Sequence, residues 1–183
     1  MYSQIYDMAV YPRHSKILER IGNVMGIDYS SQLWTNSMAL YRENSALAYK
    51  GDLRFFEGFP SPQLYNVNDN FISEDLLAES RFVQPDYMIF YENKVQESDK
   101  TYKMAGCPDL IIEVWSNSNT ADDRLRLCSL YSTSETSEFW QFEQNSNTVL
   151  CSKGKNNLPS QSLTNLLFTQ NGLKLDLTSI KLP

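Results

Sequence analysis

Two carboxylates in short, strand-like stretches of apolar residues are the side chains best suited to chemistry. Asp86 directly precedes an apolar run, and Glu113 lies between Ile112 and Val114. An unpaired buried carboxylate is costly, so such a Glu normally has a partner or binds a metal ion. If the two groups lie about 5 Å apart, they repel each other by roughly 3 kcal/mol at an effective dielectric near 20. A raised pKa, a neighbouring cation or a divalent metal would relieve this repulsion.

Carboxylate oxygens are the ligands that Mg²⁺ prefers, and divalent ions carry the chemistry of many phosphodiester-cleaving enzymes. The alternative interpretation is a pair of solvated acids at strand ends. His14 is the only histidine, which excludes sites built from several imidazoles within one chain. A serine or cysteine triad would have only His14 as its base, and the sequence has no nucleophile elbow.

The composition is that of a globular protein. Its 183 residues, 42% hydrophobic and 21% charged, predict a single domain over residues 1–183. No apolar stretch is long enough to span a bilayer, and the first residues lack the pattern of a signal peptide, so a cytoplasmic protein with no membrane partner is expected. The net charge of −6 argues against extensive contact with nucleic-acid phosphates. A dimer could form a composite basic groove, so a homodimer is one expected assembly.

The periodicity of apolar residues predicts an α/β fold with a mixed sheet. Helices are expected over Pro12–Met25 and Asn119–Tyr131, the second capped by Asn119 or Thr120. The segments expected to form strands are 38–41, 46–49 and 53–56 as a meander, 82–91 and 110–115 as the two central strands, 139–143 and 148–151 as a hairpin, and 173–177 as the closing strand. The segment Glu57–Ser80 is aromatic-rich and irregular, and Phe59, Tyr65, Phe71, Leu76 and Leu77 are expected to help it pack down.

The order of several motifs also resembles the Uma2 family of restriction-endonuclease-like proteins in the PD-(D/E)XK nuclease superfamily. The motifs are Val83-Gln84-Pro85-Asp86, Pro108 to Ser116, a helix ending Leu130-Tyr131, and Glu138-Phe139-Trp140. Tyr11 to His14, Asp52-Leu53-Arg54 and Leu173 to Leu177 extend the resemblance over nearly the whole chain. It implies a restriction-endonuclease-like fold, in which a mixed central β-sheet is flanked by helices.

The resemblance also implies a metal-dependent phosphodiesterase centre. Asp86 corresponds to the Asp of the family's Pro-Asp motif, and Glu113 to its second acidic residue. These two would bind Mg²⁺ or Mn²⁺, and Asp52 of the Asp-x-Arg strand would be a third ligand. Asp52 is equally well explained as a turn residue after Gly51. His14 matches a His of the family's first helix and is otherwise a surface or capping residue.

The basic residue of this centre is missing from both expected positions. The superfamily carries a Lys two residues after the acid, where this chain has Trp115, and the family carries one four residues before the Tyr, where it has Leu127. Arg124, three residues earlier, is the expected substitute, because Arg126 is turned about 100° away on the helix. Arg124 would stabilise phosphate charge as a catalytic residue.

A salt bridge with Asp122, Asp123 or Glu113 is the alternative role for Arg124. The sequence therefore predicts a metal-dependent endonuclease acting on DNA, with activity weakened or lost at Leu127. One alternative is a non-catalytic binding or assembly protein with a nuclease fold. Another is a small-molecule binder that uses the aromatic-rich segment.

Overall fold

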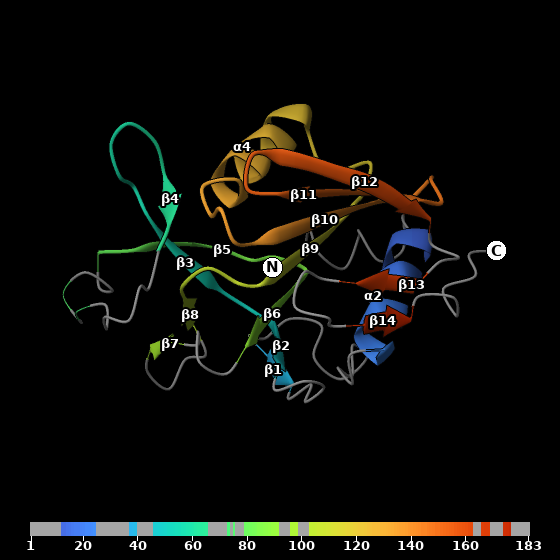
Figure 1. Ribbon diagram of the computed structural model, residues 1–183, viewed down its shortest axis with the longest axis horizontal. Helices are drawn as coiled ribbons and strands as arrows, with labels where there is room; N and C mark the ends of the chain where they lie inside the picture. Colours follow the sequence, from blue (N-terminus) through green and yellow to red (C-terminus); the bar gives the residue numbers. More distant parts are fainter. Residues whose placement is uncertain are drawn as a thin grey trace.

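The computed structural model describes residues 12–24, 37–39, 46–65, 73, 75, 79–91, 96–98, 103–162, 166–168 and 174–176 (Figure 1). Its elements are α2 (Pro12–Val24), β1 (Ser37–Ala39), β2 (Ala46–Lys50), β3 (Leu53–Phe56), β4 (Gln63–Leu64), β5 (Arg81–Val83), β6 (Tyr87–Tyr91), β7 (Gln96–Ser98), β8 (Lys103–Ala105), β9 (Leu110–Trp115), α4 (Ala121–Tyr131), β10 (Glu138–Glu143), β11 (Thr148–Lys153), β12 (Asn156–Ser162), β13 (Leu166–Phe168) and β14 (Lys174–Asp176). The fold is mixed α/β, as the sequence predicts.

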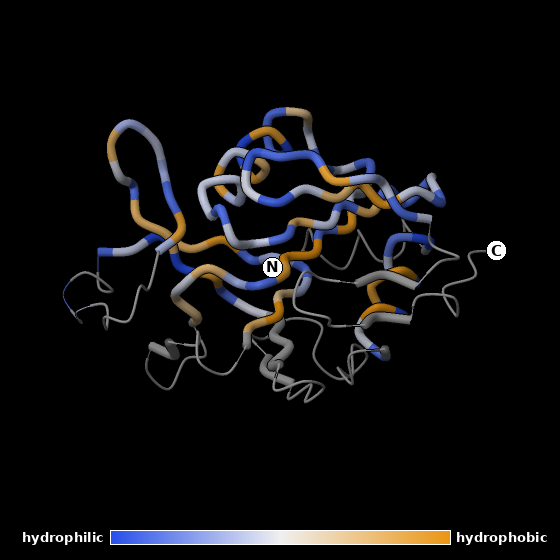
Figure 2. Tube along the Cα trace, viewed as in Figure 1, coloured by the Kyte–Doolittle hydropathy of each residue, from blue (hydrophilic) through white to orange (hydrophobic). Residues whose placement is uncertain are grey.

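The central sheet has seven strands in the order β1-β2-β6-β9-β10-β11-β12. Strands β9 and β10 pair in parallel and are connected through α4, whereas all the other neighbours pair antiparallel. All six residues of β9 are buried. Figure 2 shows this part of the molecule, where β6 and β9 lie at the centre, as its most continuously hydrophobic stretch. This agrees with a central strand that is covered on both faces.

A second, five-stranded sheet has the order β4-β3-β8-β7, with β5 also paired to β3. Four connections take the chain from one sheet to the other, and two of them position the site. Residues Gly51 and Asp52 connect β2 of the central sheet to β3 of the second sheet, and Gln84 to Asp86 connect β5 to β6 in the opposite direction. The two connections lie side by side, because Gln84 Nε2 donates to Asp52 Oδ1 at 2.6 Å.

The two helices pack on opposite faces of β9, whose side chains alternate between those faces. On one face the α2 residues Ile17, Leu18 and Ile21 are buried, and the Tyr87 hydroxyl donates to Leu18 O at 2.6 Å. The other face carries a core that α4 covers and that extends into the second sheet. Its buried members are Leu53, Phe55, Leu64, Val83, Met88, Phe90, Met104, Ile111, Trp115, Leu130, Tyr131 and Phe139.

Helix α4 begins at a capping box. Thr120 is the N-cap, its hydroxyl accepts from Asp123 N at 3.1 Å, and the Asp123 carboxylate accepts from Thr120 N at 3.3 Å. Two backbone donors of the first turn are thereby satisfied. Asp122 and Asp123 also place negative charge at the positive end of the helix dipole. The start of α4 is therefore fixed immediately after β9.

Three details differ from the sequence predictions. Segments 46–49 and 53–56 are not neighbours in a meander, because β2 and β3 belong to different sheets. Segment 82–91 is two strands, because the chain turns at Gln84 to Asp86 to change sheets. The polar segment after Cys151, which is not among the segments expected to form strands, contains β12, the edge strand of the central sheet.

The aromatic-rich segment Glu57–Ser80 is only partly described. Tyr65 is buried and its ring packs against that of Phe56 at a tilt of 47°, with centroids 5.3 Å apart, whereas Phe59 is 99% exposed. Packing is therefore confirmed for Tyr65 and wrong for Phe59, and Phe71, Leu76 and Leu77 lie outside the described residues. In the part of the chain that the structure describes, no helix has the length and apolar character needed to cross a bilayer.

Candidate functional site

The register of the central sheet brings Asp86 and Glu113 together. Tyr87 is paired with Ile112 and Met88 with Ile111 in the antiparallel β6–β9 pair. One step outward, Asp86 is therefore opposite Glu113, and both side chains point to the α4 face. Asp86 Oδ2 accepts from Val114 N at 2.7 Å, which fixes the Asp86 carboxylate at the end of the ladder.

Glu113 is 6% exposed, and burial raises its pKa well above the ordinary value of 4.5. The charge of Asp86 raises the pKa further, and so does a side-chain hydrogen bond between the two acids. Hydrogen bonds donated by the Tyr131 hydroxyl and by the Asp86 backbone act in the opposite direction. Burial and the charge of Asp86 outweigh these hydrogen bonds, so the pKa of Glu113 stays raised.

Tyr131, the last residue of α4, connects this helix to the acid pair. Its hydroxyl donates to Glu113 Oε1 at 2.7 Å in a fully buried contact. Burial raises the pKa of Tyr131 well above its usual value, and the adjacent Glu113 raises it further, so the phenol stays a donor. Its ring packs edge-on against Phe139, 5.0 Å between centroids. From the sequence, Tyr131 was expected only on the buried face of the helix.

The acid pair opens into a cavity of about 360 Å³ between the end of the central sheet and the two helices. The residues that line it are His14, Phe82, Val83, Gln84, Asp86, Glu113, Val114, Trp115, Ser116, Ser118, Asn119, Arg126 and Leu127. His14 Nε2 lies 2.7 Å from Val114 O, so α2 is tied to the same strand end. His14 and Leu127 thus both reach the site, as the family resemblance implies for their positions.

The two arginines of α4 have different surroundings. Arg124 forms an ion pair with Glu143, 2.6 Å between Nη1 and Oε1, and its guanidinium lies 5.3 Å from the centre of the Trp115 ring. The alternative of a salt bridge is thus observed, with Glu143 in place of the three expected acids. Of the described residues that line the cavity, the basic ones are His14 and Arg126. Helical spacing had favoured Arg124 over Arg126.

Asp52 lies at the connection between the two sheets. It is 3% exposed, its carboxylate accepts from Gln84 Nε2, and its backbone carbonyl accepts from Met104 N at 2.8 Å. Gln84 lines the cavity, so the hydrogen bond from Gln84 links Asp52 indirectly to the site. This contact could not be foreseen from spacing, because it depends on the chain changing sheets at both residues.

The donor set fits a hard divalent cation. Mg²⁺ commonly takes one or two carboxylates and completes its shell with water and substrate phosphate. Asp86 is half-buried, and both Asp86 and Glu113 line the cavity. Within the described ranges, no group of three or more His, Cys, Asp or Glu could hold a metal. Asp86 and Glu113 would therefore provide the protein ligands, and water or phosphate the remainder.

The family model of Uma2, described as "Putative restriction endonuclease", matches residues 57–178, which is more than half of the chain. The chain belongs to the Uma2 family. The matched range contains Asp86, Glu113 and Leu127, whereas His14 and Asp52 precede it.

A solved structure has the same fold as this Uma2 chain. It is a crystal structure of a "putative nuclease belonging to DUF820" from Anabaena variabilis, with a TM-score of 0.52 and 15% sequence identity. The similarity covers 91% of this chain and 80% of the other. No curated protein matches the chain. Family and fold together indicate a nuclease.

Proposed function

We propose that this protein is a metal-dependent nuclease that hydrolyses phosphodiester bonds of DNA, with Asp86 and Glu113 as the ligands of Mg²⁺ or Mn²⁺. The observation that supports the proposal is the contact between these two acids at the base of a cavity. Two adjacent acids, one of them buried, cost stability, and a bound cation would offset their repulsion. A scaffold alone gains nothing from such a pair.

In this proposal, each residue near the acid pair has a role that follows from its position. The backbone N–H of Val114 and the Tyr131 hydroxyl each orient one carboxylate, so that the two acids need not reorganise when a cation binds. A divalent ion held there would polarise the phosphate and lower the pKa of an attacking water. Leu127 lines the same cavity in the position of the family's Lys. Slow turnover is therefore expected, since a missing electrostatic group typically costs ~10²–10⁴ in rate.

Metal binding is tested first, by thermal unfolding in EDTA and in a titration with Mn²⁺ or Mg²⁺. The wild type should gain stability with metal, as any ligand of the native state requires. Glu113→Gln should abolish the gain. Glu138→Gln is the matched control, since Glu138 is equally buried on the neighbouring strand but does not line the cavity. It should keep the response.

Two further variants assign the remaining candidates. Asp52→Asn keeps an oxygen that can accept from Gln84, so it should respond to Mn²⁺ like the wild type if Asp52 only positions Gln84. Loss of the response would make Asp52 a ligand. Cleavage of supercoiled plasmid and of single-stranded DNA is then measured with Mn²⁺, and Glu113→Gln must remove it. A wild type that binds no divalent ion and cleaves neither substrate would reject the proposal.

The second candidate function is a non-catalytic binding or assembly protein. Leu127 favours it, because an apolar side chain lies where the family has a cation. This alternative predicts a protein that folds and binds DNA without cleaving it under any metal condition.

A further inference from the structure

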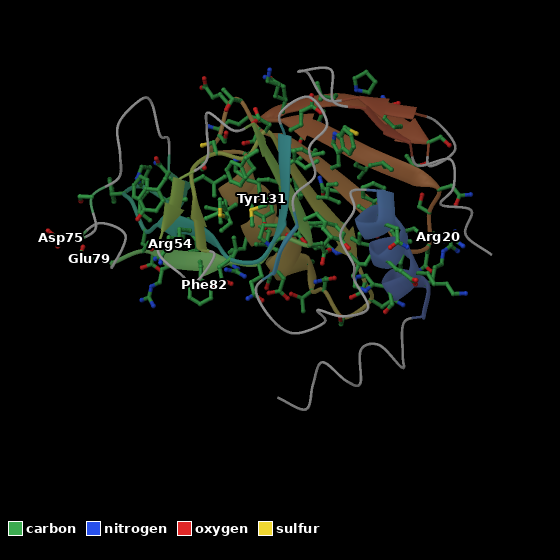
Figure 3. All side chains as sticks on the ribbon, turned by 90° about the horizontal axis from the view of Figure 1, so that it is seen from below. Arg20, Arg54, Asp75, Glu79, Phe82 and Tyr131 are labelled. Atoms are coloured by element: carbon green, nitrogen blue, oxygen red, sulfur yellow. The ribbon has the colours of Figure 1, made fainter. Side chains whose placement is uncertain are left out.

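Two residues at the mouth of the cavity have no role in the proposed metal chemistry. Phe82 belongs to β5, where Val83 points into the core and Phe82 is 50% exposed. Figure 3 shows Phe82 at the periphery of the fold and Tyr131 in its interior. Half of this aromatic side chain is therefore exposed where it lines a polar cavity, so it presents apolar surface to a ligand that enters there.

The second residue is Arg126, which is exposed on α4 and lines the same cavity. Hydrogen bonds with Thr120 are the main cause of the lowered pKa of Asp123, and the charge of Arg126 makes a smaller contribution in the same direction. Arg124, by contrast, is engaged with Glu143 and the Trp115 ring. A guanidinium presents a planar set of donors that matches phosphate oxygens.

We propose that Phe82 and Arg126 form a subsite for one unpaired nucleotide of a single DNA strand, in which Phe82 stacks on the base and Arg126 binds a phosphate. This inference rests on the proposed nuclease function and narrows its substrate to unpaired strands. The cavity of about 360 Å³ lies at the lower end of the usual range for ligand sites. Phe82 precedes Asp86 by four residues, which places their Cα atoms at most roughly 13 Å apart.

The charge distribution favours a single strand over a duplex. Duplex binding depends on many Lys and Arg contacts to phosphates, and this chain has a net charge of −6. Stacking on an aromatic ring requires a base that is free of its partner, and it contributes much of the affinity for single strands. One arginine and one exposed phenylalanine in a cavity match one unpaired nucleotide better than a duplex groove.

A second surface of similar composition provides matched controls. A groove lies between the β3–β4 connection and the β11–β12 turn, and is lined by Lys153, Lys155 and Pro60, the neighbour of the exposed Phe59. Phe59 and Lys155 therefore resemble Phe82 and Arg126 in chemistry, but they do not line the acid-pair cavity.

The test measures binding of a short fluorescent oligodeoxythymidine to the full chain by anisotropy, in EDTA and again in Ca²⁺. Phe82→Ala should weaken binding roughly 5- to 150-fold, the range found for removal of one stacking platform. Phe82→Tyr should restore it. Arg126→Gln should reduce the slope of log K against log salt by about 0.7, the contribution of one phosphate contact on a single strand. Phe59→Ala and Lys155→Gln should change neither quantity.

Several results would overturn the subsite. These are equal losses in the Phe59 and Lys155 variants, unchanged binding in the Phe82 and Arg126 variants, tighter binding of a duplex of the same length, or no strand binding in either buffer. The nuclease proposal can fail separately. If the protein binds the strand through Phe82 and Arg126 but shows no metal-dependent cleavage, the subsite stands and the nuclease proposal is rejected. If metal-dependent cleavage is unchanged in Phe82→Ala and Arg126→Gln, the nuclease proposal stands and the subsite is rejected.

Discussion

Replacing Glu113 by Gln should stabilise the metal-free protein, and the gain should increase with pH. The pKa of Glu113 is raised in the folded protein, above an ordinary value of 4.5. Between these two pKa values the folded protein holds a proton that the unfolded chain has released. The wild type is therefore fully stabilised below about pH 4.5 and loses stability as the pH rises through the folded-state pKa. The amide of the Glu113→Gln variant does not titrate in this range, so this contribution is absent.

The magnitude follows from the linkage slope and the charge pair. Each pH unit between the two pKa values removes about 1.4 kcal/mol from the free energy of unfolding of the wild type. Two carboxylates about 5 Å apart repel by roughly 3 kcal/mol at an effective dielectric near 20. For a chain of this size, 3 kcal/mol is a difference in Tm of roughly 6–12 °C.

The assay measures the free energy of unfolding in urea for wild type, Glu113→Gln and Asp86→Asn, in EDTA and at pH values between about 4.5 and about 9. The two variants should each flatten the pH profile, and the double variant should gain less than the sum of the two, since both remove the same repulsion. If the free energy of unfolding depends on pH in the same way for wild type and Glu113→Gln, the raised pKa of Glu113 would be refuted. A Glu113→Gln variant that is less stable at high pH would point to a cation already paired with Glu113.

The other predictions concern cations near the site. Leu127→Lys should raise metal-dependent plasmid cleavage by roughly 10- to 100-fold, and adding Glu113→Gln should remove this gain. Leu127→Lys should also lower the free energy of unfolding in urea by up to about 1.5 kcal/mol. The loss is limited because Leu127 is only half-buried and the Lys stem recovers part of its contact. Arg124→Gln should cost roughly 0.2–1 kcal/mol, as expected for the partly exposed pair with Glu143, and leave metal-dependent cleavage within about twofold; a large loss of activity with folding intact would restore a catalytic role for Arg124.

Local patterns predicted the elements that have one dominant signal. The helix expected over Pro12–Met25 is α2 (Pro12–Val24), and the fully apolar run at 110–115 is β9. The adjacency of Asp86 and Glu113 was predicted from the apolar continuity of both segments together with the family resemblance, and Asp86 itself lies just before β6. The hairpin of β10 and β11 has strong strand formers on both sides of a polar turn.

Features that depend on distant partners were not predictable. Segments 46–56 and 81–91 have the patterns of ordinary strands, but each divides between two sheets, at Asp52 and Gln84 respectively. The hydrogen bond that joins these two residues, which are far apart in the sequence, cannot be read from either segment alone. Strand β12 has a polar, largely exposed sequence with Pro159, which is unfavourable for a central strand. It is tolerated because β12 is an edge strand, where a missing donor leaves no neighbour unpaired.

The same limit explains the position of the arginines. Helical spacing correctly put Arg124 near the face of Leu127, but it carries no information on what that face meets one turn earlier. There α4 passes the ends of β9 and β10, where Trp115 and Glu143 engage the guanidinium. Arg126, although rotated from Leu127, lies further along the helix beside the cavity. A long side chain can reach a site from a neighbouring position on the helix.

The acid pair and the missing lysine together suggest how this site differs from a fast nuclease. A Lys at position 127 would put a permanent cation beside Glu113, which would lower its pKa and favour the ionised pair without metal. With Leu127 in that position, no such cation lowers the raised pKa of Glu113, so under the proposed function a metal ion would have to displace a proton to bind. Metal affinity should then rise steeply with pH. Arg126, at the mouth of the cavity, can attract a phosphate without neutralising the buried acids. Under the two proposals, the site would hold a strand and a metal and turn over slowly.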